Sequence, residues 1–507
     1  MKSFFKSSII VALGTLVSRF SGLARELLLA WFFGATTMAD VVNVAFKLPN
    51  LFRRIFAEGA LSIVFIPIFN SLEDKKVKQE FASQTFFWLV TILSIFTIAF
   101  EYFMPQIVAL IAPGFLMEEE IFITTIALCR ITILYLIFVS VCALIGGILN
   151  SLDKFGAFAF NQVILNAVLI IFTLAIYYFT ILDVAHAFCL GLVLGGAMQL
   201  LVIYKIMIDA DFKLFWPSNF YSIELKTLMI RIVPALGSAG VMQINLFISQ
   251  IIASFIVGAI SVLNFAERIY QFPLSILGIT FSTVLLPELS KLNKSELTKQ
   301  SYNIQNNVIK LSLILSLPCA IGIMIFSQEF INLIYERGAF DSIATQKVAN
   351  VLFWFALGLP AFILVKIFTT ILYAKGKTLI SFKITLYSII ANVALNIIFM
   401  HYLGEIGIAL GSSISAWLHV ALLVYVTIKY KYYSNAIESI YWLKLLGLNL
   451  ITIIILSYVH TYLALYYYSW GSITKIICIL TIISFTMIFY FLAAAKLKIA
   501  KFNFISQ

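Results

Sequence analysis

Charged residues are scarce in this chain. Asp, Glu, Lys and Arg make up 11% of its 507 residues, whereas 62% of the residues are hydrophobic. Soluble globular domains carry about 25% charged residues, so this composition excludes a water-soluble globule and predicts an integral membrane protein. The net charge of +11 would suggest a nucleic-acid partner in a soluble protein. Lysines in short loops on one side of a membrane explain most of it here, so we expect no nucleic acid.

Metal-ligand and catalytic patterns are also missing. The five cysteines stand far apart in apolar segments and the four histidines are unclustered, so we expect no metal site. There is no Gly-rich phosphate loop ending in Gly-Lys-Ser/Thr, which indicates that the chain does not hydrolyse ATP. The acidic run 118–120 is typical of a solvated loop. We therefore predict that the chain is not an enzyme and holds no cofactor.

Long apolar runs are what the chain has instead. About 20 apolar residues cross a bilayer as a helix, so the breaks between runs predict an all-α polytopic membrane protein with fourteen transmembrane helices. The expected spans are 8–33, 40–70, 82–104, 122–149, 157–180, 185–207, 227–257, 261–287, 307–333, 346–373, 379–402, 405–429, 439–464 and 472–496.

Basic residues predict how these helices are oriented. Every second connection is rich in Lys, while the alternate connections carry mainly acidic residues such as Glu118 and Asp183. The positive-inside rule therefore puts both termini in the cytoplasm. An even number of helices agrees with this placement.

A weak internal repeat predicts two lobes. The stretch 45–49 followed by Pro67 resembles the stretch 269–273 followed by Pro287, six helices later. Transporters built from two similar halves show such repeats and bind substrate where the halves meet. We expect a six-helix N-terminal lobe, a six-helix C-terminal lobe and a final helix pair. Their predicted bounds are 1–207, 227–429 and 439–496.

Charges interrupt the first two apolar segments. One Arg at the bilayer centre costs roughly 2.5–3.5 kcal/mol, so such residues are expected to face a wet cavity or a partner. Helical spacing puts Arg19 and Glu26 on one stripe and Arg25 about 120° away. In the alternative reading, these arginines reach the membrane interface along their flexible stems.

Further arginines predict what the cavity binds. Arg53 and Arg54 lie in the second segment and Arg268 lies in the eighth. A guanidinium is a planar fork that binds phosphate oxygens in pairs, so three or four of them converging from different helices would suit a diphosphate. For Arg268, an ion pair with Glu267 is the structural alternative.

Three stretches carry a family resemblance: SRFSGLARE, ADVVNVAFKLPNLFRRIFAEGALS and AERIYQFP, which begin at Ser18, Ala39 and Ala266. They resemble the MurJ/MviN lipid II flippases of the MOP exporter superfamily. The resemblance implies transfer of lipid II from the cytoplasmic to the periplasmic leaflet of the bacterial inner membrane, in peptidoglycan biosynthesis, cell wall biogenesis and cell shape. We expect alternating access through a cationic central cavity.

The resemblance also implies functional residues. The family's important charges map onto Arg19, Arg25, Asp40, Arg53, Arg54 and Arg268, and Glu26 stands where Asp also occurs in the family. The final pair 439–496 would line a groove for the polyprenyl tail. The expected partners are lipid II and membrane lipids, with cell-wall synthesis proteins as candidates, and we expect a monomer.

At two places this sequence departs from the family pattern, so the family's residue roles cannot be assigned there. Gln271 replaces a Glu that some relatives carry before the Pro of the eighth helix, so no acidic role follows there. The places of a sodium site described for some members fall on Ser249, Asn392, Asn396 and Ser412. None of these is a carboxylate, which argues against sodium coupling and leaves the membrane potential as a candidate driving force.

Two other functions remain open from the sequence. A flippase for another polyprenyl-diphosphate oligosaccharide would need the same diphosphate site. A MATE-like exporter of drugs and cations is the second alternative. It should have an acidic, aromatic cavity rather than a cationic one, so the arginines argue against it.

Overall fold

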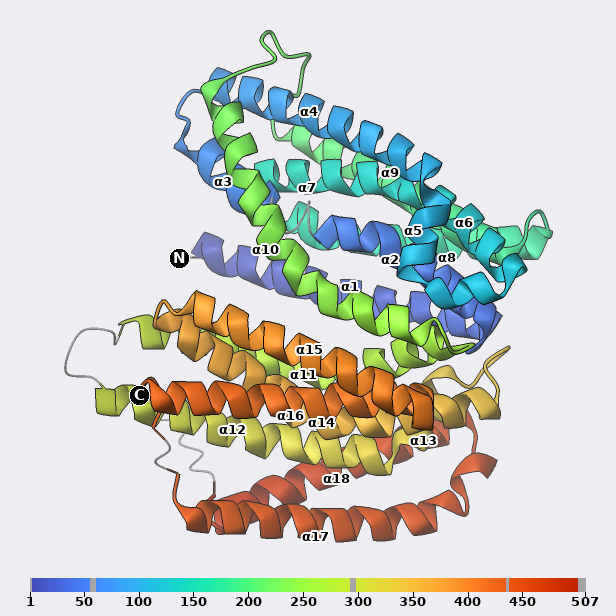
Figure 1. The fold of residues 1–507 in the computed structure, drawn as a ribbon, viewed down its shortest axis with the longest axis vertical. Coiled ribbons are helices and arrows are strands. Elements are labelled where there is room, and N and C mark those ends of the chain that lie inside the picture. The colour runs from blue at the N-terminus through green and yellow to red at the C-terminus, as the bar shows by residue number, and fades with distance from the viewer. Residues whose placement is uncertain (1, 55–60, 292–297, 435–436, 500–507) are drawn as a thin grey trace. The chain divides into compact units, whose positions relative to one another are not determined.

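The computed structural model describes residues 2–54, 61–291, 298–434 and 437–499. These residues form α-helices and short 3-10 turns, with no β-strand among them (Figure 1). The prediction of an all-α protein is therefore confirmed for the described part of the chain. The chain divides into two compact units, Met1–Ser261 and Val262–Gln507.

The described residues of the first unit form ten complete α-helices and one 3-10 helix. They are α1 (Lys2–Phe33), α2 (Thr37–Phe52), α3 (Ser62–Ser71), α4 (Lys75–Tyr102), α5 (Met104–Ile111), η2 (Pro113–Met117), α6 (Glu119–Ile133), α7 (Tyr135–Ser151), α8 (Phe155–Phe179), α9 (Val184–Asp209) and α10 (Ile223–Ala253). The unit ends within the first turn of α11 (Ala259–Lys291). It thus includes α10, the helix expected to open the second lobe; the lobe bounds themselves stay a prediction.

Aromatic rings form much of the core of the first unit. Phe65 and Phe69 of α3 stack at 5.4 Å between ring centroids, and Phe65 stacks on Phe81 of α4 at 5.3 Å. Aliphatic residues of α7 and α9, such as Ile145 and Met207, complete this cluster. The cluster fixes α3 and α4 against the middle of the unit.

A small-residue contact joins α8 to α9. A Cβ atom added at Gly195 of α9 would lie 2.8 Å from Leu165 Cδ1 and 3.0 Å from its backbone oxygen. Gly191, one turn earlier, approaches Leu169 in the same way. This is the G-x-x-x-G spacing that lets membrane helices approach closely and pack without a hydrophobic driving force.

The second unit contains the remaining helices. They are the rest of α11, then α12 (Thr298–Ile325), α13 (Ser327–Tyr335), α14 (Ser342–Ala374), α15 (Thr378–Leu403), α16 (Glu405–Lys429), α17 (Ser439–Ala464), η3 (Tyr467–Ser469) and α18 (Ser472–Lys496). Within it, α14 and α15 both pack on α16. The Ser413 hydroxyl of α16 donates to the Trp354 carbonyl of α14 at 2.6 Å.

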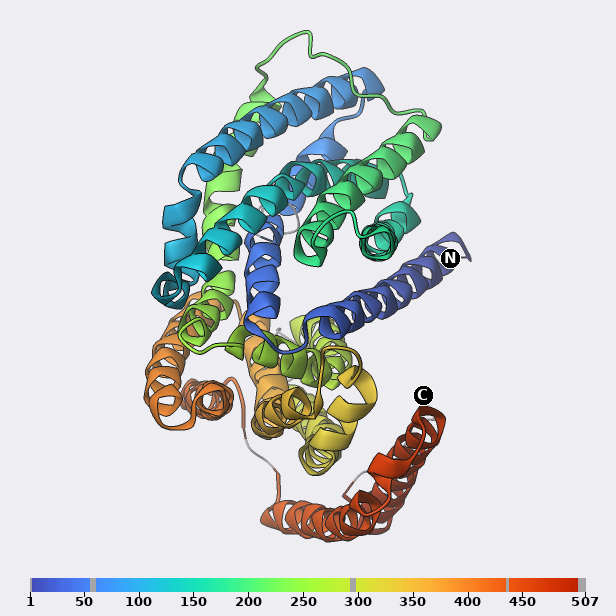
Figure 2. The same cartoon turned by 90° about the vertical axis from the view of Figure 1, so that its right-hand side faces the viewer.

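The last two long helices form a hairpin closed by η3 (Figure 2). The hairpin packs on α12 and α13 through an apolar cluster that includes Phe326, Leu456 and Ile479. Polar contacts support the same end of the hairpin, because the Tyr467 hydroxyl donates to the Glu329 carbonyl at 3.0 Å. The helices α17 and α18 are thus adjacent in the structure, while the predicted division 439–496 stays a prediction.

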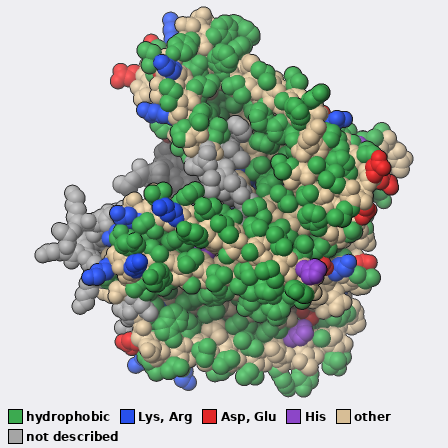
Figure 3. Space-filling view, viewed as in Figure 1, with side chains coloured by type: hydrophobic (Ala, Val, Ile, Leu, Met, Phe, Trp, Pro, Cys, Tyr) green, Lys and Arg blue, Asp and Glu red, His purple; other side chains and the backbone are tan. Residues whose placement is uncertain are grey.

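Ten helical segments are long and apolar enough to cross a membrane, among the residues described. Hydrophobic side chains cover most of the face shown in Figure 3, so the chain is a multi-pass membrane protein. The ten coincide with predicted spans. The other four predicted spans fall on α1, on α2 and α3, on α10 and on α11. Part of the span 40–70 lies outside the described residues, and the count of fourteen stays a prediction.

Candidate functional site

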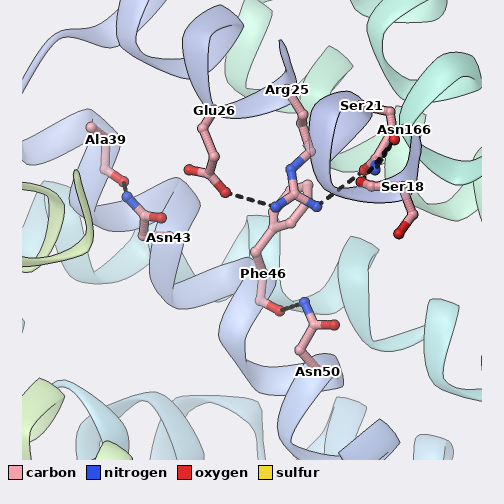
Figure 4. A network of polar contacts seen from close by, with 9 residues as sticks. All are labelled: Ser18, Ser21, Arg25, Glu26, Ala39, Asn43, Phe46, Asn50 and Asn166. Carbon is pink, nitrogen blue, oxygen red and sulfur yellow. Dashed lines mark hydrogen bonds and ion pairs between the residues drawn. The ribbon is translucent and has the colours of Figure 1, made fainter. Parts of the chain in front are cut away.

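Arg25 lies at the centre of a polar network inside the first unit (Figure 4). α1 packs against α8, which brings Asn166 of α8 to the guanidinium. Arg25 Nη1 donates to Asn166 Oδ1 at 3.4 Å, and Arg25 Nη2 donates to Glu26 Oε1 at 2.7 Å. The Asn166 amide in turn donates to the Ser21 hydroxyl at 3.0 Å. A charged side chain is thereby held at two points within an apolar bundle.

The Arg25–Glu26 pair is shielded from solvent. Their side chains are 16% and 10% exposed, and the guanidinium stands 5.6 Å from the ring centre of Phe46 on α2. Helical spacing predicted that Glu26 would share a stripe with Arg19. In the structure its carboxylate reaches the adjacent Arg25 instead, because two long side chains can bridge 100° of helix surface. Arg19 is exposed on α1.

A proline shapes the second helix beside this network. Pro49 has no N–H, so it leaves the Ala45 carbonyl without its helical partner. The Thr132 hydroxyl of α6 donates to that carbonyl at 2.8 Å, as side chains do for freed backbone groups in membranes. One residue further on, Asn50 Oδ1 accepts from Arg53 Nε at 3.1 Å. The Pro-Asn pair thus orients the half-buried Arg53.

Arg54 points to a different helix. It is exposed, and its Nη1 donates to Gln243 Oε1 of α10 at 3.5 Å. Adjacent residues on a helix are separated by about 100°, which explains why Arg53 and Arg54 have different partners. Residues 55–60, which follow them, lie outside the described part of the chain.

Asp40 is fully buried in the first turn of α2. Its Oδ1 accepts the backbone N–H of Ser261 in the first turn of α11, at 2.6 Å. A carboxylate at a helix N-terminus is favoured by the unpaired N–H groups and the helix dipole. Asp40 thus stabilises the start of α11 in the structure, while its contact with a substrate stays a prediction.

Arg268 is exposed on the part of α11 that belongs to the second unit. One residue before it, Glu267 accepts a hydrogen bond from Gln271 Nε2 at 2.6 Å. The neutral amide at position 271 thus engages this carboxylate. The predicted meeting of Arg268 with the arginines of the first unit stays a prediction.

The residues named for sodium lie on three helices. Asn392 and Asn396 are buried on α15, and Ser412 is half-buried on α16. Both amide atoms of Asn396 are buried and have no hydrogen-bond partner among the described residues. Its Oδ1 would lie 2.4 Å from a Cβ atom added at Gly411. Ser249 is half-buried on α10, in the first unit. Among the described residues, no group of three or more His, Cys, Asp or Glu could hold a metal ion.

Asn166 and Thr132 were missed by sequence reasoning, although each supports an arginine helix. The available signal was polarity: Asn166 stands in the otherwise apolar run VILNAVLI. A polar residue in such a run is expected to face a partner. The identity of that partner depends on packing between segments 141 residues apart, which spacing does not provide.

An apolar helical bundle that holds oriented guanidinium groups inside its span belongs to the class of multi-pass membrane transporters. Comparison with known proteins narrows this class. The family model described as lipid II flippase MurJ matches residues 29–481. A protein of Rickettsia prowazekii named probable lipid II flippase MurJ is 46% identical over 99% of both chains. The chain therefore belongs to the lipid II flippase MurJ family.

Solved structures agree with this assignment. A lipid II flippase MurJ in an inward closed conformation is similar, with a TM-score of 0.78 and 25% identity over 96% of this chain and 99% of that one. An inward-facing MATE multidrug transporter of the MOP superfamily has a TM-score of 0.66, over 83% of this chain and 98% of its own. Its identity is 14%, so this second likeness concerns the fold alone.

Proposed function

We propose that this chain moves lipid II from the cytoplasmic to the periplasmic leaflet of the bacterial inner membrane, by alternating access through a cationic cavity. Membership of the lipid II flippase MurJ family supports the substrate. The observation that supports the chemistry is the guanidinium of Arg25, held by Glu26 and Asn166 inside the bundle. No covalent bond changes in this step, so the chain acts as a transporter and not as an enzyme.

The diphosphate of lipid II is the group that these arginines would bind. Arg25 and Arg53 are each oriented by a neighbouring amide, Asn166 and Asn50, which reduces the entropy lost when a ligand is bound. The exposed Arg19, Arg54 and Arg268 would add further guanidinium contacts to the diphosphate as the cavity closes. Bidentate geometry favours Arg over Lys for each of these contacts.

The proposal includes the setting of the chain in its membrane. Fourteen helices cross the bilayer, both termini lie in the cytoplasm, and the polyprenyl tail stays in lipid along the hairpin of α17 and α18. The chain acts as a monomer beside the enzymes that polymerise the cell wall. The membrane potential supplies the driving force, with no resident cofactor.

Reconstituted vesicles test this function directly. Purified chain in vesicles loaded with labelled lipid II should move it between leaflets, and Arg25→Ala should abolish that movement. Arg25→Lys should restore it only in part, because an ammonium lacks the fork. Arg337→Ala is the matched control, since Arg337 is exposed beyond the end of α13 and bonds the Leu333 carbonyl. Normal transport by Arg25→Ala would exclude this network as the substrate site.

A second candidate is a flippase for another polyprenyl-diphosphate oligosaccharide, since the arginines bind the shared diphosphate. The same vesicles separate the two, by comparing lipid II with a polyprenyl diphosphate that carries a different sugar. Preference for the second lipid would favour the alternative. The MATE-like fold also permits an exporter of cationic drugs, which should not be transported if the cavity is cationic.

A further inference from the structure

Lys366 is a charged residue inside α14 that neither the arginine sites nor the sodium candidates include. It interrupts the apolar run AFILVKIFTT and is half-buried. It lies eight residues, or about 12 Å, before the end of α14 at Ala374. Its ammonium makes no hydrogen bond or ion pair with any residue that the structure describes.

The side chain of Lys366 lies against Gly278 of α11. A Cβ atom at Gly278 would stand 2.9 Å from Lys366 Cδ and 3.2 Å from its Nζ. The same two helices meet further along through aromatic rings, where Tyr270 packs on Phe355 at 4.9 Å and on Phe362 at 5.7 Å. Lys366 follows Phe362 by one helical turn, so it continues the row of α14 side chains that faces α11.

An apolar side chain would serve packing better at this place. A Lys in a membrane span is costly and by default marks a polar pathway or a ligand. Two acidic residues lie on α11, Glu267 eleven residues before Gly278 and Glu288 ten residues after it, so each is about 15–16 Å from Gly278 along the helix. Glu267 is moreover bonded to Gln271. Packing therefore does not explain Lys366, and an anion from outside the chain would neutralise it.

The position along the helices indicates when that anion arrives. Gly278 is ten residues, or about 15 Å, beyond Arg268 on α11. Both α11 and α14 lead into connections with several lysines, including Lys294 and Lys377, which the positive-inside rule assigns to the cytoplasm. Lys366 is thus closer to the cytoplasmic end than Arg268 is.

We propose that Lys366 is a substrate-positioning residue on the cytoplasmic side, which binds an oxyanion of the headgroup before that headgroup reaches the depth of Arg268. Gly278 provides the room in which the ammonium lies. The inference rests on the proposed function, since the anion is part of the transported lipid. The anion is either the diphosphate or a carboxylate of the attached peptide.

Binding and stability measured on the same variants test this role. Lys366→Met keeps the length of the side chain and removes the charge. It should lower lipid II affinity about tenfold and leave the thermal midpoint equal or higher. Lys366→Arg should stay within about twofold of the original affinity. The lipid II affinity of Gly278→Ala, whose methyl group would displace the ammonium, should lie between the affinities of these two variants. Lys383→Met is the control, because Lys383 is exposed on α15.

Unchanged affinity in Lys366→Met would overturn the proposal, and so would a fall in its thermal midpoint that accounts for the lost binding. Either outcome for Lys366→Met leaves the proposed function intact, provided that the original chain transports lipid II and Arg25→Ala does not. A chain that never moves lipid II would instead refute that function. A polyprenyl diphosphate sugar without peptide identifies the anion: an equal loss with this ligand assigns the diphosphate, and a loss only with lipid II assigns the carboxylate.

Discussion

Arg25 shows what a guanidinium requires inside an apolar bundle. It has a carboxylate, an amide and an aromatic ring within reach, from α1, α8 and α2. Burying a charge without such partners is strongly unfavourable. The partners also fix its direction, which a bidentate contact with a diphosphate needs. The geometry of Arg25 therefore depends on side chains from three helices.

Asn166→Leu tests this dependence. The change removes the amide that bonds both Arg25 and Ser21, and a hydrogen bond to a charged group contributes about 1.5–3 kcal/mol. We expect lipid II affinity to fall at least about tenfold, measured by binding to the purified variant. Asn43→Leu is the control, because the Asn43 amide donates to the Ala39 carbonyl of its own helix (Figure 4). Equal affinity in the two variants would contradict the positioning role.

Sequence spacing located the charged residues but not their contacts. Arg25 and Arg53 were recognised because a charge in an apolar run stands out at once. The bond between Asp40 and Ser261 joins residues 221 apart, and no helical period relates them. Lys366 was visible by the same criterion as the arginines. Its contact with Gly278 depends on how α11 packs against α14, and this packing is known only from the structure.

At the scale of helices, the α8–α9 contact depends on Gly195. Gly195→Leu would force a branched side chain against Leu165, where even one methyl group has no room. Overpacking costs typically about 1–3 kcal/mol, so the thermal midpoint in detergent should fall by several degrees. Gly447→Leu on α17 is the control, because nothing lies within 4 Å of its added Cβ. Similar midpoints for both variants would show that α8 and α9 do not need this close approach.

The hairpin of α17 and α18 depends on a buried carboxylate. The Glu329 side chain is 1% exposed, and its Oε1 lies 3.1 Å from His460 Nε2 on α17. Leaving a buried polar group without its partner costs about 1–3 kcal/mol, so His460→Leu should loosen the hairpin. Faster cleavage by a protease between α16 and α17 would measure this. His401→Leu, at an exposed site on α15, should not change that rate.

Helix positions were predictable wherever apolar residues continue for a full span. The segments α4, α8, α9 and α14–α18 coincide with predicted spans for this reason. The break at Phe326, between α12 and α13, was not predicted. Residue 326 is neither Pro nor Gly, so its identity does not predict a break. In the structure the helix is interrupted there, since ψ of Phe326 is 25°.

At the scale of the whole molecule, we expect transport to depend on voltage, because the proposed cationic cavity would carry its positive charge through the membrane's electric field. An inside-negative potential favours inward movement of positive charge by about 2.3 kcal/mol per charge per 100 mV. If the unloaded cationic cavity returns inward as one net charge, collapsing the potential should slow turnover by up to about fiftyfold. Vesicles with a potassium gradient and an ionophore measure this. Unchanged turnover without a potential would exclude voltage as the driving force.

The start of α11 has a consequence for hybrid proteins assembled from two relatives. Gly258, with φ of +79°, passes within 3.0 Å of the Ala35 oxygen, measured from an added Cβ, and three residues later Ser261 donates to Asp40. The segments 35–40 and 258–261, which are far apart in the sequence, thus pack closely against each other. A crossover placed anywhere between residues 40 and 254 would take these two contacting segments from different parents. Hybrids should therefore fold best when both segments come from the same parent.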